Sequence, residues 1–332
     1  MTFDIDNLQD LTGQVAVITG GNAGIGEICS QRIAKHGAKV YVLCRSKQKY
    51  DDALQRCQDY DAETAKRWTY VQCDLADLES VKAAAETIKS KEDHLDMLIN
   101  NAGVMAVPYS LTKQGLEIQC GTNVVGHALL SYMLLPLLVT SARKLAGTGR
   151  SVRMVQLSSI AHSKFGKGLP QHSWENLEKV NQDCGGTWGR YGKSKVGNIL
   201  LANQLKQLTA NENMSHLSIH PGYVNTGLYN GLDQSYGFFG KVFRTLGSKF
   251  FLVTPAEGAS SSIYAAVSSE IDEKNLNGTY FDPKTKIGKA EPWAQDKDGV
   301  LGKQMIDFCK TFCKEKVGVD FDALAQEALE KK

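Results

Sequence analysis

Residues Gln14 to Gly26 read Q-V-A-V-I-T-G-G-N-A-G-I-G, and this stretch decides the fold. It opens with a short run of β-branched and apolar residues, Val15–Thr19, which favours a strand. After the glycines, helical spacing runs from Glu27 to His36 and stops at Gly37. A glycine turn between a strand and a helix lets backbone N–H groups approach a pyrophosphate, because no Cβ stands in the way.

The glycines stand at Gly20, Gly24 and Gly26, in the spacing G-x-x-x-G-x-G. This spacing departs from the G-x-G-x-x-G of the standard dinucleotide fingerprint, so the motif alone also fits a glycine turn without a ligand. If the turn binds a dinucleotide, Asn22 and Ile25 are candidate binding residues together with the three glycines. The rest of the chain has to separate these two interpretations.

The composition is that of a soluble globular protein: 332 residues, of which 42% are hydrophobic and 22% are charged. No linker rich in proline, glycine, serine or charge divides the chain. We therefore expect a single domain over residues 1–332, with a core at about 12–283 and a helical extension at about 284–332. The net charge of +2 is too small to favour nucleic acid as a partner. A homo-oligomer is compatible with the sequence.

Several features bear on location. The first ten residues carry acids and no apolar core, which argues against a signal peptide. The longest apolar run, Ala128–Val139, contains Pro136 and is too short to span a bilayer, so we interpret it as a buried helix. Eight irregularly spaced cysteines favour reduced thiols in the cytoplasm. Cys309 and Cys313 share a helical face without further metal ligands, so we predict packing there and no metal site.

Basic residues follow the second expected strand, Lys39–Leu43. They are Arg45 and Lys47, with Ser46 between them. In a dinucleotide fold this position reaches the adenine ribose, where a carboxylate suits NAD and a basic group suits the 2′-phosphate of NADP. No acid appears before Asp51, so the sequence favours NADP(H) over NAD(H). A solvated basic turn is the alternative.

The third and fourth strands also end in candidate binding residues. Tyr70–Cys73 is followed by Asp74 and Leu75, and Asp74 either accepts from an adenine amino group or caps the helix expected at Leu78–Lys89. The fourth strand, 95–99, is followed by Asn101, Ala102 and Gly103. Such a turn suits close approach to a planar ring, although clusters of this kind also form ordinary turns.

Four residues further along the chain are the candidates for catalysis. Asn123 stands among apolar neighbours in a helix expected at about 115–139, and a buried polar residue needs a partner. The fifth strand, 152–157, leads into Ser158 and Ser159. Tyr191 and Lys195 lie one helical turn apart in Y-G-K-S-K, hence on the same face of a helix.

The sixth strand begins at 217–219 and is followed by Pro221, Gly222, Val224 and Thr226. Beyond them Phe238–Val253 has apolar residues at helical spacing with basic residues between. This segment fits three alternatives: a helix packed on the core, a lid over a lipophilic substrate, or a contact with a lipid surface. A helix at 258–267 and a last strand at 278–281 follow.

Alternating strands and helices predict an α/β fold, a Rossmann-type doubly wound parallel sheet of about seven strands with helices on both faces. In such a sheet the ligand lies beyond the carboxyl ends of the strands. The glycine turn, the basic turn, the Asn101 turn and the two serines all fall there. Their convergence strengthens each motif.

In these motifs the sequence resembles the short-chain dehydrogenase/reductase family. The resemblance covers Thr12 to about Asp282 and includes T-G-G-N-A-G-I-G, N-N-A-G, Asn123, the serine pair, Y-G-K-S-K and P-G-Y-V-N-T, in the family's order. The glycine spacing is the family's own version of the turn. V-L-C-R, T-N-V-V-G-H, L-S-S-I-A-H and the long gap before Tyr191 resemble its retinol dehydrogenase-like branch.

The resemblance implies a role for each candidate. Tyr191 is the general acid and base, Lys195 lowers the pKa of Tyr191 and holds the nicotinamide ribose, Ser159 polarises the carbonyl, and Asn123 supports a water relay. Val224 and Thr226 are expected beside the nicotinamide carboxamide. The chemistry is consistent, because an unperturbed tyrosine has a pKa of about 10 and a nearby ammonium favours the phenolate.

We therefore expect an NADP(H)-dependent oxidoreductase that interconverts a lipophilic alcohol and its aldehyde or ketone. The alternatives are a cofactor-bound sensor or scaffold without catalysis, and a lipid-surface protein with vestigial activity. The location expected is the cytoplasm, with peripheral contact to a lipid droplet or membrane through Phe238–Val253 as an option. The first residues lack the apolar anchor of the branch, so retinoid activity is not carried over.

Overall fold

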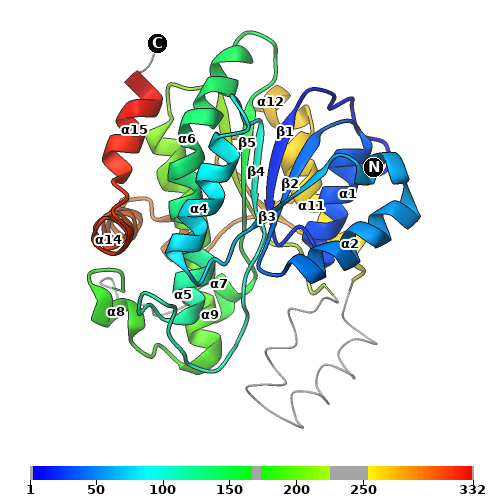
Figure 1. The fold of residues 1–332 in the computed structure, drawn as a ribbon. Coiled ribbons are helices and arrows are strands. Elements are labelled where there is room, and N and C mark those ends of the chain that lie inside the picture. Colours follow the sequence, from blue (N-terminus) through cyan, green and yellow to red (C-terminus); the bar gives the residue numbers. More distant parts are fainter. Residues whose placement is uncertain (1–2, 167–172, 225–252, 331–332) are drawn as a thin grey trace.

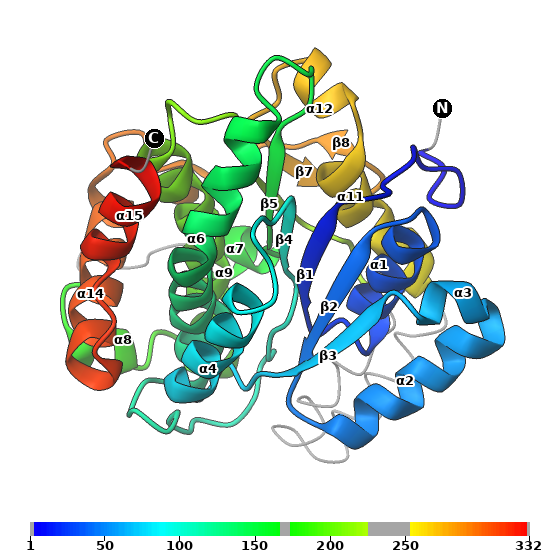
Figure 2. The ribbon, with the colours of Figure 1, turned by 45° about the horizontal axis from the view of Figure 1, so that its top comes forward.

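All seven strands expected from the sequence are present. The computed structural model describes residues 3–166, 173–224 and 253–330. Within these ranges eight strands form one sheet in the order β3-β2-β1-β4-β5-β6-β7-β8 (Figures 1 and 2). Their bounds are β1 Val15–Thr19, β2 Lys39–Cys44, β3 Trp68–Gln72, β4 Met97–Asn100, β5 Val152–Leu157, β6 Met214–Ile219, β7 Tyr280–Asp282 and β8 Lys286–Ile287.

The pairing is parallel from β3 through β7, and β8 alone among the described strands pairs antiparallel, with β7. Every residue of β1, β5 and β6 is buried. This is the pattern of strands covered on both faces. The apolar run of β1 in the sequence agrees with it, whereas β5 and β6 also bury polar side chains, among them Arg153 and His216. The predicted α/β fold, a doubly wound parallel sheet, is confirmed.

Helices cover both faces of the sheet (Figures 1 and 2). One face carries α1 Gly24–Lys35, α2 Lys47–Tyr60, α3 Ala62–Ala65 and α11 Pro255–Val267. The opposite face carries α4 Leu78–Lys89, α6 Gly126–Lys144, α9 Gly186–Leu208, α14 Val300–Val317 and α15 Phe321–Glu330. Shorter helices connect these layers: α5 Ile118–Cys120, α7 Ala161–Lys164, α8 Leu177–Asn181, α12 Glu270–Glu273 and α13 Pro292–Gln295.

The helix expected at about 115–139 is a composite. It begins as α5, continues as a π-helical turn, η1, over Gly121–Val125, and ends as α6. The segment Ile118–Lys144 is apolar and long enough to cross a membrane, but 89% of its most apolar window is buried inside the protein. It is thus a core helix, as predicted for Ala128–Val139, and Pro136 lies within it.

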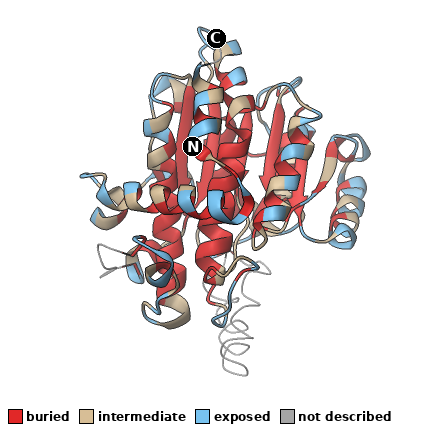
Figure 3. Cartoon of the chain, turned by 60° about the vertical axis from the view of Figure 1, so that its left-hand side comes forward, coloured by how far each residue is buried: buried red, intermediate tan, exposed pale blue. Residues whose placement is uncertain are grey.

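The C-terminal extension expected at about 284–332 contains the strand β8 and the helices α13, α14 and α15, of which α14 and α15 pack on the sheet's helical layer. Helix α14 lies against α9, and α15 lies against α6. The rings of Tyr132 and Phe321 stack there with centroids 4.2 Å apart. Figure 3 shows the buried residues concentrated in the sheet and on the inward faces of the helices. The single domain expected over the whole chain stays a prediction.

All eight cysteines are free thiols. Cys309 and Cys313 are buried in α14, where they pack in the core as predicted. Across 3–166, 173–224 and 253–330, no group of three or more histidine, cysteine or acidic side chains is arranged to hold a metal ion.

The expected bounds differ from the observed ones mainly at strand ends. The third strand runs over 68–72 instead of 70–73, the fourth over 97–100 instead of 95–99, and the last begins at Tyr280. In the third and fourth strands the hydrophobic pattern extends past the paired residues or starts inside them. Pairing with a neighbouring strand sets the ends, and a single sequence does not contain that information.

Candidate active site

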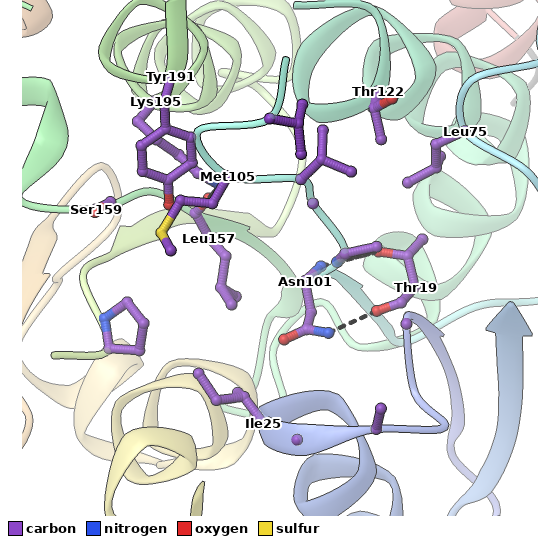
Figure 4. A pocket seen from close by; sticks show the side chains of 18 of the residues that line it. Thr19, Ile25, Leu75, Asn101, Met105, Thr122, Leu157, Ser159, Tyr191 and Lys195 are labelled. Carbon is purple, nitrogen blue, oxygen red and sulfur yellow. Dashed lines mark hydrogen bonds between the residues drawn. The ribbon is translucent and has the colours of Figure 1, made fainter. Parts of the chain in front are cut away.

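A cavity of about 1510 Å³ opens at the carboxyl ends of the parallel strands. Its walls come from the loops that follow β1 to β6 and from α9, so segments far apart in the sequence meet there. The order of the sheet reverses between β1 and β4, and such a switch point is where open α/β sheets bind ligands. Figure 4 shows Tyr191, Lys195 and Ser159 together at one side of this cleft, with Asn101 and Thr19 at another.

The glycine turn forms one wall of the cleft. Gly20 and Gly24 have φ angles of 64° and 56°, in the left-handed region that favours glycine. Together with Asn22 and Ile25 they line the cavity. Gly26 does not line it: a Cβ there would lie 2.3 Å from the carbonyl oxygen of Gly20, so this glycine lets α1 start close against the turn.

The turn after β4 is fastened to the end of β1. The hydroxyl oxygen of Thr19 accepts from the backbone N–H groups of Asn101 at 2.9 Å and Ala102 at 3.0 Å. The Asn101 side chain donates to the Thr19 carbonyl oxygen at 2.8 Å (Figure 4). Asn101, Ala102 and Gly103 all line the cleft.

Two of the three residues expected in the basic turn after β2 reach the cleft. Arg45 and Ser46 line the cleft, but Lys47 does not. Ser46 caps α2 by accepting from the backbone N–H of Lys49 at 3.3 Å, and Lys47, the first residue of the helix, pairs with Asp51 on the outside. Lys49 lines the cleft instead. The positive groups at this end are therefore Arg45, Lys49 and the N-terminus of α2.

Asp74 and Leu75 line the cleft. The Asp74 carboxylate accepts from the backbone N–H of Ala76 at 3.0 Å. The alternative in which Asp74 caps the next helix is wrong, because Asp77 is the N-cap of α4 and accepts from Glu79 N.

Tyr191 and Lys195 lie on one face of α9 and point into the cleft (Figure 4). The Lys195 ammonium donates to the Leu157 carbonyl oxygen at 2.8 Å and to Asn198 Oδ1 at 3.3 Å. Its nitrogen lies 5.6 Å from the centre of the Tyr191 ring. Burial lowers the pKa of Lys195 to about 7, since a charged amine loses its hydration there.

The two serines after β5 differ in their surroundings. The Ser158 hydroxyl donates to the carbonyl oxygen of Lys195 at 2.8 Å and is buried. The Ser159 hydroxyl oxygen accepts from Ala161 N at 3.2 Å, which leaves its own proton free to turn toward the cleft that it lines. This difference supports the choice of Ser159 over Ser158.

Asn123 does not line the cleft, but it holds a residue that does. Its Oδ1 accepts from Val104 N at 2.9 Å, and its Nδ2 donates to the Val104 carbonyl oxygen at 3.0 Å and to Ser194 Oγ at 2.9 Å. The expectation that this buried amide needs partners is confirmed. The two rim residues Pro221 and Gly222 and the neighbouring Val224 line the cleft, whereas Thr226 and residues 238–252 lie outside the described residues.

The amino-acid sequence of this chain matches the family model described as short chain dehydrogenase over residues 14–171. An uncharacterised oxidoreductase from Schizosaccharomyces pombe is 36% identical over 279 residues, which cover 84% of this chain and 79% of that protein. The chain belongs to the short-chain dehydrogenase family. It is therefore a dehydrogenase or reductase.

Further comparisons place this short-chain dehydrogenase more closely. Retinol dehydrogenase 11 from Mus musculus is 35% identical, over 82% of this chain and 78% of that protein, which confirms the resemblance to the retinol dehydrogenase-like branch. The crystal structure of an uncharacterised protein from Mycobacterium paratuberculosis superposes with a TM-score of 0.67 and 25% identity, covering 97% of this chain and 99% of that one.

The cleft of this short-chain dehydrogenase has an apolar wall that the sequence did not indicate. Met105, Phe165 and Trp188 line it, and the rings of Phe165 and Trp188 stack with centroids 5.1 Å apart. Trp188 lies one helical turn before Tyr191, and that spacing was a usable signal. Phe165 carried none, because it follows α7 in an irregular segment.

The geometry fits a dinucleotide. The glycine turn presents backbone where a Cβ would obstruct it, α1 begins at that turn, and the cavity extends from there to Tyr191. Arg45, Ser46 and Lys49 stand at the end of β2, where the adenine ribose of a bound dinucleotide lies in folds of this type.

Proposed function

We propose that the protein is an NADP(H)-dependent oxidoreductase that interconverts a lipophilic alcohol and its aldehyde or ketone, with Tyr191 as general acid and base. One observation carries the proposal. Tyr191, Lys195 and Ser159 line the same cleft as the glycine turn, so a dinucleotide and a carbonyl compound can meet beside a proton donor. The four residues Asn123, Ser159, Tyr191 and Lys195 together weigh against a sensor or scaffold, which does not need all of them.

Three positive groups support NADP(H) over NAD(H). The guanidinium of Arg45 and the ammonium of Lys49 line the cleft beside the capped N-terminus of α2. A 2′-phosphate suits this combination, because an arginine fork matches phosphate oxygens and a helix N-terminus favours an anion. Ser46 adds a hydroxyl at the same place.

When bound, the nicotinamide dinucleotide supplies or removes the hydride, and the residues of the chain handle the oxygen and its proton. Ser159 donates a hydrogen bond to the substrate oxygen, and Tyr191 gives that oxygen its proton during reduction. In the reverse direction Tyr191 removes the proton from the alcohol. The amine of Lys195 is held near the Tyr191 ring by Leu157 and Asn198, and its charge favours the phenolate.

The apolar wall supports a lipophilic substrate. Phe165 and Trp188 present stacked rings to the cleft, and Met105 lies on the Tyr191 side, where it packs with Ala161. Burying apolar substrate surface against such a wall is favourable by roughly 25 cal/mol per Å² removed from water. A small polar alcohol would leave these apolar side chains exposed to water and would gain little from this burial.

A turnover screen tests the proposal. Purified protein is given NADPH or NADH with matched pairs of aldehydes and ketones that differ in chain length, and NADP⁺ or NAD⁺ with the corresponding alcohols. We expect turnover with the phosphorylated cofactor, rising with apolar length. No turnover of any member with either cofactor would overturn the proposal.

The other expectations stay predictions: a cytoplasmic location, a homo-oligomer, and peripheral contact with a lipid surface through Phe238–Val253. The residues that would make this contact, apart from Val253 at its end, lie outside the described residues.

A further inference from the structure

A chain of hydrogen bonds leads from Lys195 away from the cleft. The Lys195 ammonium donates to Asn198 Oδ1 at 3.3 Å, and Asn198 Nδ2 donates to the backbone carbonyl oxygen of Asn123 at 2.7 Å. An ammonium only donates and a carbonyl only accepts, so the two neighbours fix the orientation of the Asn198 amide. Asn198 thereby ties Lys195 to the π-helical turn that contains Asn123.

The chain continues through His127. Its Nδ1 lies 3.0 Å from the same Asn123 carbonyl oxygen, and its Nε2 lies 2.9 Å from Thr19 Oγ1. That hydroxyl oxygen already accepts from the N–H groups of Asn101 and Ala102, which use both of its lone pairs. The Thr19 proton is left for His127 Nε2. The imidazole must therefore carry its own proton on Nδ1 and donate it to Asn123.

Every link of this chain is away from water. Thr19, His127 and Asn198 are exposed by 1%, 0% and 1%. Burial lowers the pKa of His127 to about 4, the bond to Asn123 opposes this shift, and the charge of Lys195 adds to it. His127 is thus neutral near pH 7. In such surroundings a lost partner is not replaced by solvent, and the group left unpaired is costly.

We propose that His127 and Asn198 are positioning residues, which hold the Lys195 ammonium and the Asn101–Ala102 turn in a fixed relation. The two ends of the chain both line the cleft, Lys195 beside Tyr191 and Asn101 beside the glycine turn. They come from α9 and from the loop after β4, and His127 and Asn198 bridge the space between them. The enzymatic consequence rests on the proposed function, but the hydrogen-bond directions belong to the protein itself.

A nuclear magnetic resonance experiment tests the directions without any activity. His216 is the internal reference, because it is buried against Thr209 at 2.7 Å and the Thr209 proton is already donated to Leu205 O at 2.9 Å. His216 must therefore donate from Nε2. In protein labelled with ¹⁵N-histidine we expect two neutral imidazoles of opposite tautomer at pH 7, protonated on Nδ1 in His127 and on Nε2 in His216.

The chain has seven histidines, and the signals of His127 and His216 are the ones missing from the spectra of His127→Gln and His216→Gln, respectively. An Nε2-protonated His127, or a His127 that titrates near its ordinary pKa of about 6.5, would overturn the proposal. The tautomers are read from the wild-type spectrum once these two signals are assigned. If a glutamine variant does not fold, the leucine variant at the same position, His127→Leu or His216→Leu, assigns the signal.

Cofactor affinity tests the positioning role. In His127→Leu the Thr19 hydroxyl loses its acceptor, whereas the amide oxygen of His127→Gln can accept in its place. We expect His127→Leu to raise the Kd for NADP⁺ about tenfold, the effect of one buried hydrogen bond, and His127→Gln to restore it to within about threefold. His216→Leu, the matched control outside the cleft, is expected to leave the Kd unchanged.

If His127 only stabilises the fold, the measurements on His127→Leu have a different result. If His127→Leu lowers thermal stability but leaves the Kd where His216→Leu leaves it, the positioning role is wrong. If the wild-type protein binds neither NADP⁺ nor NAD⁺, the proposed function fails, and the tautomers still decide whether the chain of hydrogen bonds has the stated directions.

Discussion

At the scale of single residues, the site depends on polar groups kept from water. The acceptors that hold the Lys195 ammonium are a backbone carbonyl and an amide oxygen, which are neutral and compensate the buried charge only in part. The side-chain amide of Asn123 bonds the backbone N–H and the backbone carbonyl of Val104. The backbone carbonyl oxygen of Asn123 accepts from His127 and Asn198. The sequence indicated that these residues need partners. It could not name the partners, because they come from other elements.

The buried amine of Lys195 has a consequence for stability. Its pKa is about 7 in the folded protein and about 10.4 in an unfolded chain. Below pH 7 both states carry the proton and the cost of burying the charge is fully present. Between pH 7 and 10 the unfolded chain binds more protons, so stability rises with pH, by at most about 1.4 kcal/mol per unit.

We therefore expect the free energy of unfolding of the wild type to increase relative to that of Lys195→Met as the pH rises above 7. Urea denaturation at a series of pH values from about 6 to 9 measures the difference. Lys206→Met, which removes an exposed lysine from the same helix, is the matched control and should show no such gain. Parallel curves for wild type and Lys195→Met would contradict a pKa of Lys195 lowered by burial.

At the scale of elements, the start of α2 decides which basic groups reach the cleft. The sequence placed Arg45, Ser46 and Lys47 there as one turn. Because Ser46 caps a helix that begins at Lys47, successive side chains rotate by about 100° and Lys47 points outward to Asp51. Lys49 takes its place. The cap could be recognised in the sequence, but not the direction in which the helix leaves the strand.

This arrangement predicts a difference between neighbouring lysines. We expect Arg45→Ala and Lys49→Ala each to weaken NADP⁺ relative to NAD⁺ by about tenfold, since each removes a charge-assisted contact to a 2′-phosphate. Lys47→Ala removes the same charge outside the cleft and should leave the ratio within about twofold. Titration of each variant with both cofactors gives the ratio. An unchanged ratio in Arg45→Ala would show that our account of this turn is wrong.

Two other elements, the π-helical turn and β8, could not be predicted from the hydrophobic pattern. The π-helical turn Gly121–Val125 adds a residue to a helical turn, and the apolar pattern through it is too uniform to reveal this. Strand β8 has two exposed residues and no alternation to detect. The parallel strands, by contrast, were found in number and order, because their apolar runs are separated by helical spacing and turn residues.

At the scale of the whole molecule, two buried clusters of side chains lie on opposite faces of the sheet. The cleft lies at the carboxyl ends of the strands, where the strand order reverses between β1 and β4. Strand order brings the glycine turn, the Asn101 turn and Ser159 to that end, and α9 adds Tyr191 there. This is why the site could largely be predicted from motifs. The apolar wall and the network through His127 could not, because they depend on how α6, α7 and α9 pack.

The central claim is that Tyr191 transfers the proton while a bound nicotinamide dinucleotide exchanges the hydride, and it needs the whole cleft assembled. The most direct test compares wild type with Tyr191→Phe on the best substrate of the turnover screen, measuring kcat and the Kd for NADPH together. We predict that kcat falls by at least about 100-fold while the Kd stays within about threefold, since only the proton donor is lost. Full turnover in Tyr191→Phe would contradict the account.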